Sequence, residues 1–277
     1  MPSILLEKCT RCLKCVKDCP SDSIDLEKGR IEQTCIHCGH CVAICPESAV
    51  LPDEGSIHPL KSSALKAEDL EMFFSGLRSI RSYQGKEVPK EILVRLAENI
   101  KHYSSASNAR PLQVTFVTDP EKIQRLNDAT ADTLIRTLKV ISSPMISPFI
   151  KIFAPSVNLK GLKRYNESFI QKKQTNSSMV CHHAPVVMLF HGKKQKYDMS
   201  EADAYIWASN TVIYAKSLGL GSCYIGFIVK AMERNKRLRE EMNIPEGHRV
   251  YAALVLGYSK VSYRNETSRK APEVHWV

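Results

Sequence analysis

Long uninterrupted apolar runs are missing from this sequence of 277 residues. The most apolar basic stretch, residues 134–164, contains three prolines and several charges, so we expect neither a transmembrane helix nor membrane association. A mobile cover over a binding site and an interfacial membrane segment both remain open for it. The N-terminus, MPSILLEKCT, has no basic region followed by an apolar run and a small-residue cleavage site. We therefore expect a soluble protein in the reducing cytoplasm.

Cysteine is scarce over most of the chain. Of ten cysteines, eight lie in the first 45 residues, and only Cys181 and Cys223 lie in the other 232. Charge divides as unevenly: residues 1–60 carry a net charge of −3, whereas residues 61–277 carry +13. These two asymmetries predict two chemically different modules.

The early cysteines form two copies of one motif. CTRCLKCVKDCP begins at Cys9 and CIHCGHCVAICP at Cys35, each reading C-x2-C-x2-C-x3-C-P. A disulfide framework would need an oxidising compartment, and zinc sites usually take their ligands as separated pairs. Three cysteines in one tight loop with a fourth before proline are typical of iron–sulfur clusters. The cysteines of the two copies, 26 residues apart, are Cys9, Cys12, Cys15 and Cys19, then Cys35, Cys38, Cys41 and Cys45.

Residues 1–58 resemble a bacterial-type ferredoxin with two 4Fe–4S clusters. The resemblance implies crossed ligation: Cys45 would join the first three cysteines of the first copy, and Cys19 would join those of the second. SIDLEKGRIEQ, between the copies, reads as a hairpin around Lys28-Gly29. His37 and His40 are expected to face solvent or to hydrogen-bond near the cluster sulfurs. A module this small has little core, so its clusters should supply much of its folding free energy.

The remaining chain mixes helix and strand signals without strict alternation, which favours an α+β fold. Residues 52–66 have the composition of a linker, and we expect domains at 1–58 and 67–277 joined by residues 59–66. Helices are expected at 66–75, 89–102, 120–139, 200–218 and 230–243. Strands are expected at 112–118, 184–190 and 249–257.

Three segments of this second domain combine cations, hydroxyls, amides and glycines: LRSIRSYQGKEVP (77–89), SASNARPLQVTFV (105–117) and AKSLGLGSCYIGF (215–227). Such residues suit an anionic, hydrogen-bonding ligand. Singly, Arg78 and Arg81 could be a solvated helix start, and Gly219 and Gly221 a helix C-cap. The glycine spacing, after a helix, is not the fingerprint of a dinucleotide fold.

The order of these segments resembles the FMN-dependent nitroreductase family across nearly all of residues 70–277. The family's arginine motif aligns with residues 77–81, where Leu77 replaces its first arginine, and Arg110 and Leu112 depart from the family's glutamine and tryptophan. Ile225 and Gly226 would contact the flavin ring through their backbones, and Arg269, beside Lys270, would contact the phosphate. The implied FMN contacts are Arg78, Ser79, Arg81, Ser107, Asn108, Ile225, Gly226 and Arg269.

These resemblances imply an oxidoreductase in which electrons pass from a low-potential donor through two 4Fe–4S clusters to FMN, and on to a nitro compound or related small-molecule acceptor. No side chain is expected to act as acid, base or nucleophile. The donor would be a ferredoxin- or flavodoxin-like protein or NAD(P)H, and no nucleic acid partner is expected. The family resemblance implies a homodimer, with the tail EVHWV (273–277) packing across the partner. A non-catalytic electron-transfer or flavin-storage protein, and a different oxidation or dehalogenation on the same scaffold, remain open.

Overall fold

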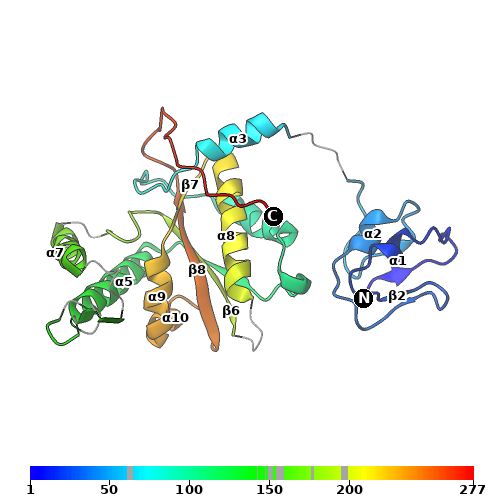
Figure 1. Ribbon diagram of the computed structural model, residues 1–277, viewed down its shortest axis with the longest axis horizontal. Helices are drawn as coiled ribbons and strands as arrows, with labels where there is room; N and C mark the ends of the chain where they lie inside the picture. The colour runs from blue at the N-terminus through cyan, green and yellow to red at the C-terminus, as the bar shows by residue number, and fades with distance from the viewer. Residues whose placement is uncertain are drawn as a thin grey trace. The chain divides into compact units, whose positions relative to one another are not determined.

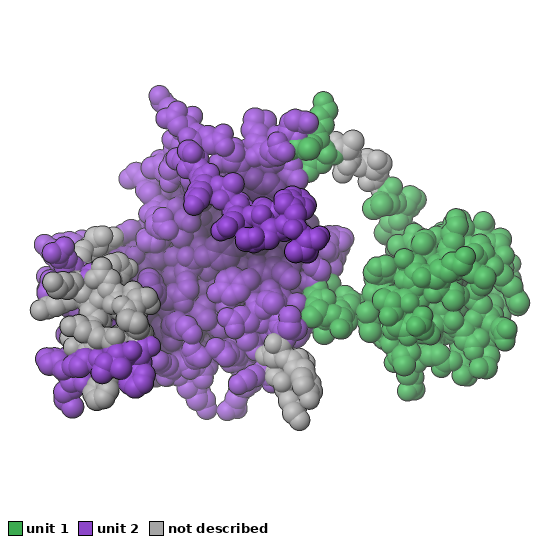
Figure 2. All heavy atoms as spheres, viewed as in Figure 1, with its two compact units in different colours: residues 1–67, 105–110 green, residues 68–104, 111–277 purple. Residues whose placement is uncertain are grey.

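The computed structural model of the protein describes residues 1–60, 65–141, 143–146, 148, 152–153, 159–175, 178–194 and 199–277. Its chain forms two compact units (Figure 2). Unit 1 comprises Met1–Ala67 and Ser105–Arg110, and unit 2 comprises Glu68–Ser104 and Pro111–Val277. Residues 61–64 of the expected linker lie outside the described residues, as do parts of the apolar basic stretch at 142, 147, 149–151 and 154–158.

Unit 1 consists of very short elements around the cysteine motifs (Figure 1). They are β1 (Ser3–Ile4), α1 (Lys14–Lys17), β2 (Ile24–Asp25), β3 (Arg30–Ile31), α2 (His40–Ile44) and β4 (Val50–Leu51). Strand β1 pairs antiparallel with β4, and β2 pairs antiparallel with β3 in the hairpin predicted around Gly29, whose φ is 62°. The main apolar cluster of this unit buries only Cys15, Ile31, Cys41 and Val50. Unit 1 therefore has little core of its own.

The sequence repeat of unit 1 is also a repeat of backbone conformation. Three pairs of residues 26 positions apart adopt left-handed φ angles, which non-glycine residues adopt at a cost. Arg11 and His37 both have φ of 54°, and Asp22 and Ser48 have 48° and 49°. In the third pair, Leu13 has 61° where Gly39 has 76°. The two cysteine loops are thus built to one geometry, and in five of these six positions without the help of glycine.

Unit 2 is a four-stranded antiparallel sheet in the order β5-β6-β8-β7 with helices on both faces (Figure 1). Its strands are β5 (Gln113–Val117), β6 (Val186–Lys193), β7 (Gly221–Tyr224) and β8 (His248–Gly257). Its helices are α3 (Ala67–Ser75), α4 (Lys90–Asn99), α5 (Pro120–Ile141), α7 (Leu159–Thr175), α8 (Ser200–Ser217), α9 (Gly226–Arg234) and α10 (Lys236–Glu241). A 3₁₀ turn, η1 (Ile100–His102), follows α4, and another, η2 (Ala106–Asn108), belongs to unit 1.

Alternating side chains of the central strands build two cores. Val187 and Leu189 of β6 face a cluster that includes residues of α5 and α9, while Met188 and Phe190 face a cluster that includes residues of α4 and α8. Both faces of the sheet are therefore buried, which explains why β6 and β8 read as nearly continuous apolar runs. These two cores fix the sheet that carries the site of unit 2.

The structure confirms the predicted α+β class and differs from the prediction in three elements of unit 2, of which one is the unpredicted helix α7. The expected helix 230–243 is two helices, α9 and α10, because Asn235 is extended and its side chain accepts a hydrogen bond from the Leu238 amide as the N-cap of α10. Strand β7 was not predicted, because four residues that begin with glycine give no alternating pattern. Within the described ranges, no helix combines the length and apolar character that crossing a membrane requires.

Candidate functional site

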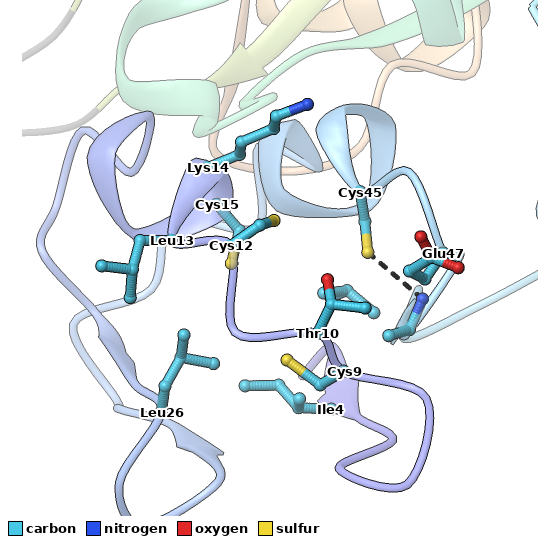
Figure 3. A pocket seen from close by; sticks show the side chains of 12 residues that line it. Ile4, Cys9, Thr10, Cys12, Leu13, Lys14, Cys15, Leu26, Cys45 and Glu47 are labelled. Atoms are coloured by element: carbon cyan, nitrogen blue, oxygen red, sulfur yellow. Dashed lines mark hydrogen bonds between the residues drawn. The ribbon is translucent and has the colours of Figure 1, made fainter.

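A first cavity in unit 1 is walled by four cysteines (Figure 3). Cys9, Cys12 and Cys15 come from the first loop and the start of α1, and Cys45 comes from the second motif, just after α2. The cavity is otherwise lined mainly by apolar groups, including Ile4, Leu13, Leu26 and Val50. The fold therefore brings together the set of four that the ferredoxin resemblance implied.

A second cavity repeats this arrangement with the motifs exchanged. Cys35, Cys38 and Cys41 come from the second motif, and Cys19 comes from the first. Because the chain crosses between the two cavities, each requires both motifs.

Backbone amides point at the sulfurs in a matched pattern. The Arg11 amide donates to Cys9 Sγ and the His37 amide to Cys35 Sγ, both at 3.4 Å. At the fourth cysteine of each motif, the amides of Ser23 and Ala49 donate to Cys19 and Cys45 at 3.3 and 3.2 Å. Hydrogen bonds from amides stabilise thiolates and tune clusters bound by them.

The electrostatics of the sulfurs follow from burial and these amides. Burial raises the pKa of the Cys15 and Cys41 thiols, the equivalent positions of the two loops. At Cys19, burial also acts to raise the pKa, but hydrogen bonds from Ser23 and Ser21 outweigh it and the pKa is lowered.

The arrangement bears on the alternatives to iron–sulfur clusters. All ten cysteines lie in the described part of the chain, and each is a free thiol. Among the residues the structure describes, no three His, Cys, Asp or Glu side chains converge closely enough to hold a single metal ion. Each set of four sulfurs lines the wall of one cavity, an arrangement compatible with a polynuclear cluster.

His37 and His40 of the second loop are both exposed, and His40 is among the residues that line the second cavity. His37 Nδ1 lies 2.6 Å from Asp53 Oδ2, and this hydrogen bond lowers the pKa of the Asp53 carboxyl. His40 begins α2 and is exposed. His37 thus faces an acid at the surface and contributes to the sulfur environment through its backbone amide.

Unit 2 contains a cavity that gathers three arginines. Arg78 and Arg81 come from the segment after α3, and Arg269 comes from the C-terminal segment nearly 200 residues later. Between them lie hydroxyls and apolar side chains from α8, β7 and the C-terminal segment, and the volume of the cavity is about 470 Å³. Its other lining residues are Phe74, Leu77, Ser79, Ser209, Val212, Ile213, Ser222, Cys223, Tyr224 and Tyr263.

The sheet positions the arginine segment. Ser79 forms a parallel bridge with Ser222 of β7, and the Ile80 amide donates to the Ser222 carbonyl at 2.9 Å. A Cβ at Gly221 would lie 2.7 Å from the Ile80 side chain, so this glycine permits close packing of the segment. Leu218 is the C-cap of α8, and Gly219, with φ of 78°, follows it in the left-handed conformation that commonly ends a helix.

The C-terminal segment closes the other side of the cavity. Lys260 donates from its amide to the Ser82 carbonyl at 2.9 Å, and Arg78 Nη2 donates to Thr267 Oγ1 at 3.2 Å. Arg269 Nη2 lies 3.4 Å from the Leu77 carbonyl. Residues far apart in sequence are thereby held on one anion-attracting surface.

The arginines have no acidic partners in the described part of unit 2, where the ion pairs involve other cations. Unpaired cations around an open cavity attract an anionic ligand. Cys223 lines the same cavity, and burial raises the pKa of its thiol, opposed by Arg81 and Ser79. We therefore assign it no redox role.

The other residues proposed from the sequence do not line this cavity. Ser107 and Asn108 belong to unit 1, where the Asn108 side-chain amide donates to the carbonyls of Ile36 and His37 at 3.1 and 2.9 Å. Ile225 is buried, its amide donates to Ala253 and its carbonyl accepts from Ile228, so both of its backbone groups are engaged. The ligand contacts of Ser107, Asn108, Ile225 and Gly226 stay predictions.

Sequence reasoning missed the residues of α8 and the C-terminal segment that line the cavity. Ser209, Val212 and Ile213 follow the i, i+3, i+4 spacing of one helix face, a signal that was present but indistinguishable from core packing. Tyr263 lies in a segment without regular structure and offers no periodic signal.

Comparison with known proteins completes the description. The profile of the nitroreductase family matches residues 76–258, and that of the 4Fe-4S dicluster domain matches residues 1–46. An Archaeoglobus fulgidus protein named NADH dehydrogenase/NAD(P)H nitroreductase is 25% identical over 193 residues, 70% of this chain and 86% of its own.

Two solved structures share the fold. A Bacteroides fragilis nitroreductase with bound FMN aligns with a TM-score of 0.56 and 20% identity, over 76% of this chain and 98% of its own. A Desulfitobacterium hafniense nitroreductase with bound FMN aligns with a TM-score of 0.56 and 16% identity, over 76% of this chain and 100% of its own. Both are matched over nearly their whole length, so this chain has residues beyond the shared fold.

Proposed function

Because the chain belongs to the nitroreductase family and carries a 4Fe-4S dicluster domain at its N-terminus, we propose that it is an iron–sulfur flavoprotein oxidoreductase that reduces nitro compounds or related organic acceptors. A single observation carries the proposal. One chain contains two cysteine-walled cavities and a separate cavity with three arginines that have no acidic partner among the described residues. This combination suits one-electron carriers joined to a two-electron cofactor.

Two 4Fe–4S clusters are the occupants that fit the cavities of unit 1. Cys9, Cys12, Cys15 and Cys45 would hold one cluster, and Cys19, Cys35, Cys38 and Cys41 the other. The matched amide-to-sulfur hydrogen bonds favour thiolates at the first and fourth cysteine of each motif. The apolar lining limits the access of water to each site, and solvent exposure is one of the factors that set the reduction potential of an iron–sulfur cluster.

FMN fits the cavity of unit 2. Arg78 and Arg269 would bind its phosphate, and Arg81 and Ser79 lie along the same wall for the remaining polar groups. Val212, Ile213 and Tyr224 offer apolar and aromatic surface to a planar ring. When bound, FMN exchanges electrons singly or in pairs and so connects iron–sulfur clusters with organic substrates. The side chains bind and orient, and we assign none of them a proton-transfer role.

We propose a homodimer as the working form. Four large apolar or aromatic side chains are exposed together on α8, β7 and α9: Tyr205 and Tyr224, whose rings stack with centroids 6.5 Å apart, and Ile206 and Phe227. Tyr224 also lines the arginine cavity, so a second copy on this surface would shield the cavity from water. Trp276 and Val277 of the tail are exposed and available for packing on a partner.

Two donors are compatible with the proposal. The cysteine cavities favour a low-potential protein donor such as a ferredoxin or flavodoxin. The name of the Archaeoglobus fulgidus relative points to NADH or NADPH for that protein. We propose the protein donor as the main route because this chain carries the cluster unit.

The test is anaerobic purification followed by analysis and turnover. We expect about eight iron atoms and eight sulfide ions per chain, from two four-iron clusters, with one FMN. With a chemical reductant, a nitroaromatic substrate should be converted to a reduced organic product. Loaded protein that yields no organic product would identify an electron carrier or flavin store instead of an enzyme.

A further inference from the structure

Lys216 stands close to the arginine cavity but was not among the residues expected to bind a ligand. It lies in the last turn of α8, half-buried, and its Nζ donates to the Phe73 carbonyl at 2.5 Å. The same Nζ lies 4.3 Å from the centroid of the Phe73 ring. Phe74, the next residue, lines the cavity, as do Val212 and Ile213, which precede Lys216 by four and three positions on α8. Such spacing places the three residues on one helix face.

The surroundings of Lys216 are strongly positive. Burial, and then the charge of Arg78, lower the pKa of the Lys216 ammonium. None of the ion pairs in the described part of unit 2 includes Lys216. Like charges held together without an acid destabilise the empty protein, and an anion bound among them would remove that repulsion.

The cations gather around a single turn of the chain. Arg78 Nη1 donates to the carbonyls of Ser75 and Leu77 at 2.6 and 2.8 Å, and Arg269 lies beside the Leu77 carbonyl. These carbonyls lie at or just after the C-terminus of α3, where the helix end carries partial negative charge and attracts cations. Arg78, Arg269 and Lys216 together contact the carbonyls of Phe73, Ser75 and Leu77, so three cations converge on this one turn.

Within the turn contacted by these cations, the residue that lines the cavity beside Arg78 has an uncharged side chain. Leu77 lines the cavity directly beside Arg78 and contributes only apolar surface. Lys216 reaches the preceding residues from α8, and a Cβ at Gly76 would lie 2.8 Å from its Nζ. Gly76 therefore leaves room for the ammonium beside this turn.

We infer that Lys216 is a phosphate-binding residue of the flavin cavity, completing with Arg78 and Arg269 a site for the dianionic end of FMN. The inference rests on the proposed FMN function. It assigns to α8 a cation that the arginine segment lacks at Leu77. The ligand feature recognised is the terminal phosphate, so the residue should discriminate FMN from riboflavin.

The experiment measures binding of FMN and of riboflavin to full-length protein stripped of flavin, by quenching of flavin fluorescence. Lys216→Met should weaken FMN binding about tenfold or more, the usual effect of losing one charge-assisted contact, and should leave riboflavin binding unchanged. Lys216→Arg should retain most of the FMN affinity. Lys230→Met is the matched control, because Lys230 is an exposed lysine of α9 paired with Glu233, and it should behave like the unaltered protein.

The outcomes separate the inference from the function on which it rests. Equal loss of both flavins in Lys216→Met, accompanied by a lower melting temperature of the flavin-free protein, would mean a purely structural cap and overturn the inference. Unchanged FMN binding would overturn it as well, while the proposed function stands. Unaltered protein that binds no FMN would contradict the proposed function itself.

Discussion

The two units of this protein relate site and fold in opposite ways. In unit 1, eight cysteines within residues 9–45 wall two cavities, and the main apolar cluster buries only Cys15, Ile31, Cys41 and Val50. In unit 2, two large apolar clusters on either face of a sheet position a cavity whose arginines lie nearly 200 residues apart. The first unit is organised around its site, whereas the second is organised around its core.

This difference predicts a difference in stability. Half of the buried residues in the main cluster of unit 1 are themselves cysteines of the motifs. A domain of this size without a sufficient core depends on metal binding for its folding free energy. Unit 2 buries complete aliphatic and aromatic side chains on both faces of its sheet and should fold without a cofactor.

Iron removal should give the largest effect, because it takes away most of what holds unit 1 together. After anaerobic treatment with a chelator, we expect residues 1–58 to become sensitive to limited proteolysis while residues 68–277 resist it, as identified by mass spectrometry of the fragments. If both units resisted proteolysis after iron removal, or if both were digested, the predicted difference in stability between them would be contradicted.

Crossed ligation predicts which pairs of cysteine substitutions act on the same cluster. Cys19→Ala should remove about four of eight irons, and adding Cys35→Ala should remove no more, since both would ligate one cluster. Adding Cys12→Ala to Cys19→Ala should instead remove the rest. Iron analysis and electron paramagnetic resonance check this, and retention of half the iron by the Cys12/Cys19 double variant would exclude crossing.

In unit 2, a single site substitution should weaken ligand binding and leave the fold intact. Arg269→Met should lower FMN affinity about tenfold, through loss of one charge-assisted contact. Arg264→Met is the matched control, because it is an exposed arginine on the same C-terminal segment that does not line the cavity. Equal effects of the two substitutions would show only a general dependence on charge.

A pH dependence is also expected in the core of unit 2. Burial, and secondarily His248, lower the pKa of His191 from 6.5 to about 4. The His191 imidazole binds a proton more readily in the unfolded chain than in the folded one. The free energy of unfolding is therefore unaffected by this group above pH 6.5 and falls as pH drops toward 4, by up to about 3 kcal/mol. His191→Gln should flatten the dependence of the melting temperature of unit 2 over that range, and an unaltered slope would assign it to other groups.

The same contrast explains what could be predicted from the sequence. The spacing of the cysteines contains the site of unit 1 almost completely, because the ligands lie in short contiguous loops. The two long strands of unit 2 and most of its helices also follow from apolar periodicity, since each is long enough to show a period. The α+β class is confirmed for that reason.

The remainder depends on tertiary packing. Strand β7 exists because β8 pairs with it and the arginine segment lies beside it, and its four residues carry no pattern of their own. Tyr263 lines the cavity because the C-terminal segment folds back on residues 82–84, and Lys216 lies near it because α8 passes α3. No local signal marks either residue, whereas Arg78 and Arg81 lie within a short recognisable segment.

The central claim is that electrons reach the flavin unit through the cysteine-bound clusters. The most direct measurement compares Cys12→Ala/Cys38→Ala with the unaltered protein in two assays of nitroaromatic reduction, one driven by reduced ferredoxin and one by NADH or NADPH. We predict loss of the ferredoxin-driven rate, with any nicotinamide-driven rate retained because unit 2 keeps its fold and FMN. An unchanged ferredoxin-driven rate would contradict the claim.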